Sequence, residues 1–203
     1  DFSTITTPGE YLLRAEGLAD SDPFRIDSEA YLALGSAALK AFYFNRASTA
    51  LLLEHAGAYA RAAGHPDDRV KVHASAASAA RPEGTLLSAP KGWYDAGDYN
   101  KYIVNSGIST YTLLAAYEQF PEYFRRHDTG SPESGDAVPD ILDEVMWNLE
   151  WMLDMQDPDD GGVYHKLTNL SFDGSVMPGR ARAERYVVQQ GTAATLDFAA
   201  VMA

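Results

Sequence analysis

The sequence is organised around one stretch, Gly92-Trp93-Tyr94-Asp95-Ala96-Gly97-Asp98-Tyr99-Asn100-Lys101-Tyr102. Its two carboxylates, Asp95 and Asp98, are separated only by Ala96 and Gly97, which are too small to shield them. Because glycine adopts turn dihedrals closed to other residues, both carboxylates can face one point in a cleft. The flanking aromatic rings suit the apolar faces of sugar rings, and carboxylates are the acids, bases and nucleophiles of sugar-cleaving enzymes. The stretch therefore indicates a carbohydrate-cleaving site.

A structural role for the same two aspartates fits the spacing equally well. Aspartate is a favoured helix N-cap, and apolar residues at helical spacing follow the motif. These residues are Tyr102, Ile103, Ile108, Leu113, Leu114 and Tyr117. The density of aromatic side chains around the aspartates favours catalysis over capping. Among these aromatic residues, Tyr94 is the candidate for lining the cleft, whereas Trp93 is expected in the core.

Composition excludes several classes of partner and chemistry. The chain has 203 residues, 46% of them hydrophobic, which is enough to form a core. Its net charge of −13 disfavours nucleic acid and anionic membranes as partners, because both require a basic surface, whereas a neutral polymer is compatible with it. The absence of cysteine excludes a thiolate nucleophile and a Cys-based zinc site. No run approaches the ~18 apolar residues of a transmembrane helix.

The apolar pattern changes along the chain. Residues 1–27 contain two short strand-like segments, 10–16 and 23–26, which belong to a larger sheet because two strands are not stable alone. From Ser28 onward the spacing becomes helical, and we expect helices over residues 28–43, 47–60, 105–119, 139–156 and 190–203. The segment 64–90 is expected to be a long loop, and no strands alternate with the helices as a parallel sheet requires. The chain lacks an initiator Met and ends inside an apolar-rich segment, so we expect it to be part of a longer protein.

Four further segments identify a family by their order. The chain resembles glycoside hydrolase family 9, the inverting endoglucanases and their relatives. After the aspartate stretch come Pro139-Asp140-Ile141-Leu142-Asp143-Glu144-Val145 with Trp151-Met152-Leu153-Asp154-Met155-Gln156, then Gly161-Gly162-Val163-Tyr164-His165-Lys166-Leu167-Thr168, and finally Thr192-Ala193-Ala194-Thr195-Leu196-Asp197-Phe198-Ala199-Ala200-Val201-Met202-Ala203.

The resemblance implies a mainly α fold. Residues 28–203 would form the N-terminal part of an (α/α)6-barrel catalytic domain, and residues 1–27 would be the last strands of a preceding β-sandwich domain of immunoglobulin type. It also implies that Asp98 is the general base and that Asp95 helps to hold the attacking water. The general acid of the family is a glutamate beyond Ala203, so this chain alone is expected to be inactive. The implied protein is a secreted, monomeric β-1,4-glucan hydrolase whose signal peptide lies outside this chain.

Metal binding is not expected to support catalysis. Some relatives bind zinc through Cys and His in the loop before the aspartates, but here that loop offers His65 and His73 without thiolates, so we predict no zinc. Counted from Asp157, the twelfth position is Thr168 instead of the Glu that an EF-hand needs. Structural calcium held by irregular loops, as in some relatives, stays open, and no cofactor is required.

Two other functions compete with an endo-acting hydrolase. One is an exo-acting relative, such as a cellobiosidase, β-glucosidase or glucosaminidase. The other is a non-catalytic carbohydrate-binding module, which would not bring Asp95 and Asp98 together in a cleft. Among the remaining candidates, His165 fits a substrate contact or a structural role equally well. The others are expected to be structural, as first-turn acids that complement the helix dipole or as core tryptophans: Asp140, Asp143, Glu144, Trp147 and Trp151.

Overall fold

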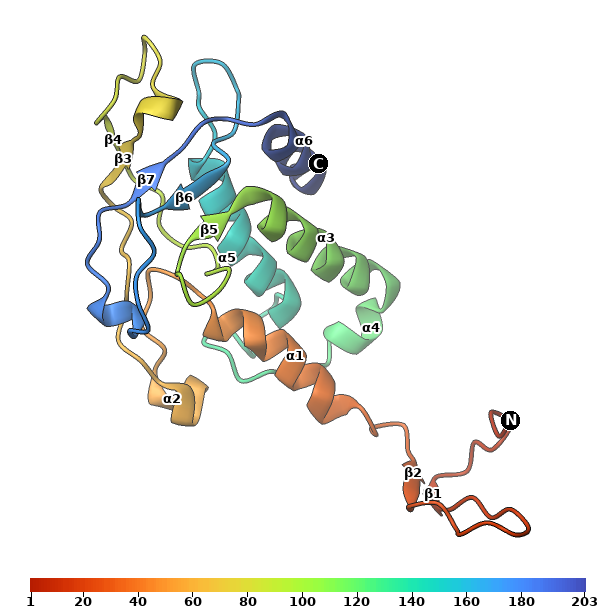
Figure 1. The fold of residues 1–203 in the computed structure, drawn as a ribbon. Coiled ribbons are helices and arrows are strands. Elements are labelled where there is room, and N and C mark those ends of the chain that lie inside the picture. The colour runs from red at the N-terminus through yellow and green to blue at the C-terminus, as the bar shows by residue number, and fades with distance from the viewer. The chain divides into compact units, whose positions relative to one another are not determined.

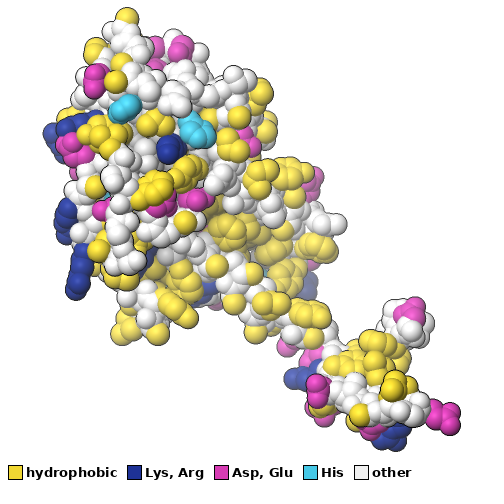
Figure 2. Space-filling view, viewed as in Figure 1, with side chains coloured by type: hydrophobic (Ala, Val, Ile, Leu, Met, Phe, Trp, Pro, Cys, Tyr) yellow, Lys and Arg dark blue, Asp and Glu magenta, His cyan; other side chains and the backbone are white.

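The computed structural model describes residues 1–203, which divide into two compact units, 1–38 and 39–203. The chain contains six α-helices and two small sheets (Figure 1). No helix combines the length and the apolar character that crossing a membrane requires. Apolar side chains are visible on the surface of both units (Figure 2).

The first unit contains the two strands expected near the N-terminus, but the first is shorter than the predicted 10–16 and the two form a sheet of their own. Strand β1 (Gly9–Tyr11) pairs antiparallel with β2 (Phe24–Ile26), so that Gly9 lies opposite Ile26. The ring of Phe24 packs between two others, with centroids 5.3 Å from Phe2 and 6.2 Å from Tyr11. The assignment of residues 1–27 to an immunoglobulin-like domain stays a prediction.

Helix α1 (Leu32–Phe44) begins in the first unit, and its second half belongs to the other unit. It begins four residues later than the sequence predicts, because the Asp27 side chain accepts a hydrogen bond from the Glu29 backbone N–H (3.0 Å) and favours a turn there. Fewer of its apolar side chains are buried than the helical spacing predicts. Tyr31 and Leu34 are 79% and 64% exposed, whereas Leu39 and Tyr43 are buried.

The second unit contains a sheet that the sequence does not predict. Five short strands lie in the order β4-β3-β7-β6-β5, with β3 and β7 parallel and the other pairs antiparallel. The strands are β3 (Val70–Val72), β4 (Leu86–Leu87), β5 (Lys101–Tyr102), β6 (Lys166–Thr168) and β7 (Tyr186–Val187). The expected all-α design and the structureless 64–90 loop are therefore wrong. Strands of two or three residues are too short to show a period of two.

The longer helices agree with the sequence within a few residues. Helix α3 packs against both α5 and α6 (Figure 1). The helices of this unit are α2 (Leu53–Ala56), α3 (Ile103–Gln119), α4 (Pro121–Phe124), α5 (Asp140–Asp154) and α6 (Thr192–Met202). Pro139 precedes the first residue of α5 instead of occupying it.

The helix expected over residues 47–60 is mostly absent. Only α2 and one following 3₁₀ turn are helical, because the preceding backbone bonds to distant segments. The Ala47 N–H donates to the Gly92 carbonyl (2.8 Å), and Leu51 and Arg61 exchange backbone hydrogen bonds (2.9 and 3.0 Å).

Three apolar clusters fill this unit. The largest lies between the sheet and helices α3, α5 and α6, and it includes Ile103, Trp151, Leu167 and Phe198. The second joins α1, α3 and α5 around Trp93. The third is a small group in which Tyr43 packs with Leu51 and Ala56. The expectation that Trp93 and Trp151 are core residues is confirmed. Trp147 is half-buried, and its indole N–H donates to the Gly92 carbonyl (3.1 Å).

Candidate active site

The loop that carries the two aspartates does not cap the helix that follows it. Helix α3 begins at Ile103, and its N-cap residue Tyr102 is extended and makes no side-chain capping bond. Strand β5 separates Asp98 from the helix. The capping interpretation of the spacing is therefore wrong, and the carboxylates are available for other contacts.

The unusual backbone conformation of the loop lies at Tyr99 instead of Gly97. Tyr99 has a left-handed φ of 58°, whereas Gly97 is not among the residues with positive φ. The expectation that Gly97 supplies a special dihedral is thus wrong. The turn is closed by backbone hydrogen bonds from Tyr99 N–H to the Ala96 carbonyl (3.1 Å) and from Asp95 N–H to the Asn100 carbonyl (2.9 Å).

Asp98 is half-buried and is held mainly through one oxygen. Its Oδ2 accepts hydrogen bonds from Asn100 Nδ2 and from the Tyr102 hydroxyl, both at 3.0 Å. Its Oδ1 receives only the Asn100 backbone N–H, at 3.4 Å. Burial, followed by the hydrogen bond to Asp98, raises the pKa of Tyr102, which keeps the hydroxyl protonated as a donor. One oxygen of Asp98 is thus anchored and the other is left largely free.

Asp95 is exposed at the wall of a small cavity. Its Oδ1 accepts a hydrogen bond from Asn105 Nδ2 (2.7 Å), which projects from the first turn of α3. The cavity has a volume of about 160 Å³ and is lined by Phe42, Asn45, Trp93, Tyr94, Asp95, Asn105, Ser106 and Ser109. Asp98 is not among these residues, so this cavity alone does not bring the two carboxylates together.

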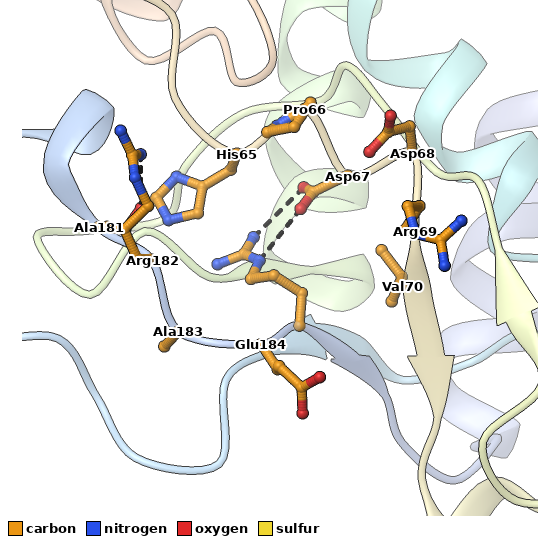
Figure 3. Close-up of a pocket in the computed structure, with 11 residues that line it drawn as sticks. His65, Pro66, Asp67, Asp68, Arg69, Val70, Ala181, Arg182, Ala183 and Glu184 are labelled. Atoms are coloured by element: carbon orange, nitrogen blue, oxygen red, sulfur yellow. Dashed lines mark hydrogen bonds and ion pairs between the residues drawn. The ribbon is translucent and has the colours of Figure 1, made fainter.

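A buried ionic network fixes the far side of the loop. Arg185, which precedes β7, bonds Asp67 through Nε (3.2 Å) and also donates through Nη1 to the Tyr99 carbonyl (2.7 Å). The same Asp67 lies 2.9 Å from Lys101 Nζ. Burial lowers the pKa of Lys101 to about 8, and the attraction of Asp67 opposes that change. The ion pair of Asp67 forms one wall of a second cavity, of about 310 Å³ (Figure 3).

Tyr94 belongs to an aromatic cluster beneath the loop. It is 5% exposed, its ring lies edge-on to Tyr99 with centroids 5.1 Å apart, and its hydroxyl lies 2.9 Å from His65 Nδ1. Burial raises the pKa of Tyr94, and burial lowers the pKa of His65 to about 4, so both side chains are neutral at pH 7. Tyr94 lines the small cavity, but its contact with substrate stays a prediction.

The two histidines considered for zinc have other contacts. His65 pairs with Tyr94, and His73 Nδ1 lies 3.0 Å from the Ser75 hydroxyl. No group of three or more His, Asp or Glu side chains is placed to hold a metal ion. His165 contributes backbone bonds that join it to Ile103 and Gln189, and both interpretations of its side chain stay open.

The acidic residues at the start of α5 serve mainly structural contacts. Asp140 accepts hydrogen bonds from the Thr129 N–H and hydroxyl (2.7 and 2.6 Å) and from Ser134. Glu144 is 3% exposed and accepts from Arg46 Nε (3.0 Å) and from Trp93 Nε1 (2.6 Å). Asp143 differs, because burial and the neighbouring acidic residues raise its pKa to about 6.

Sequence reasoning missed three residues that donate to Asp95 or Asp98, and it also missed Arg185, which holds the loop that carries them. Asn100 and Tyr102 lie inside the quoted stretch, where their polar groups were a readable signal. Asn105 and Arg185 lie outside the stretch, and no local pattern marks them. Arg185 lies more than eighty residues from Tyr99 in the chain, and only the sheet brings the two together.

The comparisons with known proteins agree on one family. The model of glycosyl hydrolase family 9 matches residues 31–203. A xyloglucan-specific endo-β-1,4-glucanase of Bacteroides ovatus is 53% identical over 203 residues, covering all of this chain and 34% of that protein. Endoglucanase D of Acetivibrio thermocellus is 34% identical over 205 residues, covering all of this chain and 32% of that protein.

A solved structure gives the same result for the fold. The family 9 glycoside hydrolase structure from Bacteroides ovatus superimposes with a TM-score of 0.91 at 52% identity, over all of this chain and 37% of that one. The chain thus spans about a third of the length of the relatives that it matches. Because the family model covers most of the chain, this protein belongs to glycosyl hydrolase family 9.

Proposed function

We propose that the complete protein containing this chain hydrolyses β-1,4-glucosidic bonds with inversion, and that Asp98 is the general base. The observation that carries this proposal is the asymmetric anchoring of Asp98. A base needs an ionised oxygen with free lone pairs, held in a fixed direction. Two donors hold Oδ2, whereas Oδ1 has only one long contact.

The proposed step transfers one proton at each end of the reaction. Water attacks the anomeric carbon and loses its proton to Asp98 while the glycosidic C–O bond breaks. The leaving oxygen takes a proton from a carboxylic acid, which in inverting enzymes stands ~6.5–9.5 Å from the base to leave room for the water. Glu133 and Glu144 do not suit that role, since both are bound to Arg46.

Asp95 would orient the same water. Its carboxylate is exposed, so it can accept a hydrogen bond from water, and Asn105 fixes its direction at 2.7 Å. A water held by two carboxylates keeps a lone pair directed at the sugar carbon. We therefore assign Asp95 a supporting role.

The substrate is proposed from the relatives. The 53% identical relative is a xyloglucan-specific endo-β-1,4-glucanase, and another at 34% is an endoglucanase, which supports a neutral β-glucan and endo action. A net charge of −13 is compatible with a neutral polymer. We further propose that the protein is secreted and monomeric and needs no cofactor for the chemical step. An exo-acting enzyme is the alternative.

The test uses the protein expressed at the full length of its gene. Wild type and Asp98→Asn are assayed on xyloglucan and carboxymethylcellulose, and the anomeric form of the first product is followed by NMR. The variant should lose at least ~10²-fold in kcat, the lower range for general acid–base catalysis, while still binding oligosaccharide. Asp68→Asn, on an exposed residue, is the matched control.

Two results would overturn parts of the proposal. A kcat of Asp98→Asn within a few-fold of wild type would show that another group is the base. Release of cellobiose or glucose from chain ends only, without a fall in polymer viscosity, would favour the exo-acting alternative.

A further inference from the structure

We propose that Asn100 is a positioning residue for Asp98, and that Arg185 sets the orientation of the Asn100 amide. The inference rests on the proposed role of Asp98 as the base. It concerns the choice of which carboxylate oxygen takes the proton.

The chemistry of its neighbours determines how the Asn100 side chain is turned. Asn100 is completely buried. Its Oδ1 lies 3.2 Å from Arg185 Nη1 and 3.2 Å from the Asn169 backbone N–H. Both neighbours can only donate, so the atom facing them must be the amide oxygen. The amide nitrogen then has to face Asp98 Oδ2, at 3.0 Å.

Arg185 can impose this orientation because it is itself fixed. It is 7% exposed and contacts both oxygens of Asp67, at 3.2 and 3.4 Å. Lys101 also contacts the same Asp67, at 2.9 Å. A chain of buried contacts thus runs from Asp67 through Arg185 and Asn100 to Asp98. In such a low-dielectric interior, reversing the amide would place its NH₂ against two donors at a large energetic cost.

This orientation of the Asn100 amide makes the two oxygens of Asp98 unequal. Oδ2 accepts from Asn100 and from the Tyr102 hydroxyl, which satisfies its lone pairs in the plane of the carboxylate. Oδ1 keeps a free lone pair, because its one contact is a backbone N–H at 3.4 Å. The network thereby assigns proton transfer to Oδ1 and holds its direction.

The variant Asn100→Asp in the full-length protein separates positioning from simple packing. It is isosteric, and its carboxylate still accepts from Arg185 and Asn169, so the buried donors stay satisfied. The donor facing Asp98 is replaced by an oxygen of a second carboxylate, and the like charge repels Oδ2. We expect kcat to fall about 10- to 100-fold, the loss expected for one hydrogen bond to a charged group, with KM within about twofold of wild type. An unchanged kcat in the folded variant would overturn the inference.

A second variant keeps the test valid if Asn100→Asp does not fold. Tyr102→Phe removes only the other donor to Oδ2, at a side chain that is half-buried. It should lower kcat by about five- to tenfold with KM and melting temperature unchanged, whereas kcat equal to wild type would contradict the anchoring of Oδ2.

Failure of the inference and failure of the proposed function give different results. If wild type hydrolyses glucan and Asp98→Asn does not, the function stands, and unchanged kcat values in Asn100→Asp and Tyr102→Phe overturn only the positioning role. If Asp98→Asn retains activity, the proposed function itself fails.

Discussion

The ammonium group of Lys101 lies 2.9 Å from Oδ2 of Asp67, and neither side chain is exposed to solvent. The pair joins the end of the aspartate loop to the segment that leads into β3. Lys101 Nζ also donates to the carbonyls of Ala89 and Lys91, at 2.9 and 2.7 Å. Lys101, which lies three residues after Asp98, therefore ties the aspartate loop to Asp67 and to the segment 89–91.

Replacing Lys101 by Met should destabilise the fold. It leaves two carbonyls and part of the Asp67 charge without a partner in the interior, and removing one member of a buried pair costs about 3–5 kcal/mol. Urea unfolding measures the loss. Lys71→Met is the control, because its pair with Glu184 is partly exposed, and solvent-exposed ion pairs contribute little to stability. Equal losses in the two variants would contradict the importance of the buried pair.

Replacement by alanine should destabilise the fold at Gly92 but have little effect at Gly97. Gly92 has a φ of 73°, and a Cβ there would lie 2.8 Å from the Trp151 ring, so Gly92→Ala should cost at least ~2 kcal/mol. Gly97 lacks a positive φ and has open space at the Cβ position, so Gly97→Ala should change stability by less than ~0.5 kcal/mol. Thermal unfolding of both variants is the measurement, and a stable Gly92→Ala would refute the steric argument.

The buried His65 should make stability depend on pH. Burial lowers its pKa in the folded protein to about 4 from 6.5, so the unfolded chain binds a proton first as the pH falls. Stability is therefore unaffected by this group above about pH 6.5 and declines between pH 6.5 and 4. The full difference is on the order of 3 kcal/mol.

Urea unfolding at pH 7 and pH 4 tests this dependence. The loss of stability on acidification should be smaller in His65→Gln than in wild type. The control His73→Gln changes a less buried imidazole that bonds Ser75. If His65→Gln and wild type lost the same stability, His65 would not be the group responsible.

Asp95 and Asn105 should affect turnover together. Asp95→Asn should lower kcat severely in the full-length protein, though less than Asp98→Asn, because it orients the water without taking its proton. Asn105→Ala removes the 2.7 Å hydrogen bond to Asp95 and should lower kcat by about tenfold. If Asn105 acts only through Asp95, adding Asn105→Ala to Asp95→Asn should cause no further loss. Additive losses would mean that Asn105 acts independently.

The long helices, the two N-terminal strands and the core role of two tryptophans could be predicted from the amino-acid pattern alone. Helices α3, α5 and α6 each repeat apolar residues over at least three turns, so local spacing is enough to locate them. The aspartate stretch was also readable, because its composition is unusual within eleven residues. The left-handed conformation of Tyr99 was not, because the sequence places a glycine nearby at Gly97, which does not adopt it.

The sheet and the surroundings of the aspartates depend on contacts between segments that are distant in the chain. Strands of two or three residues carry no periodicity, and β3 finds its parallel partner β7 at Lys71 and Tyr186, far apart in the chain. The contact of Arg185 with Asn100 likewise exists only once that sheet has formed. Buried polar groups must find partners wherever the fold brings them, and that requirement, which no local pattern expresses, turns the Asn100 amide toward Asp98.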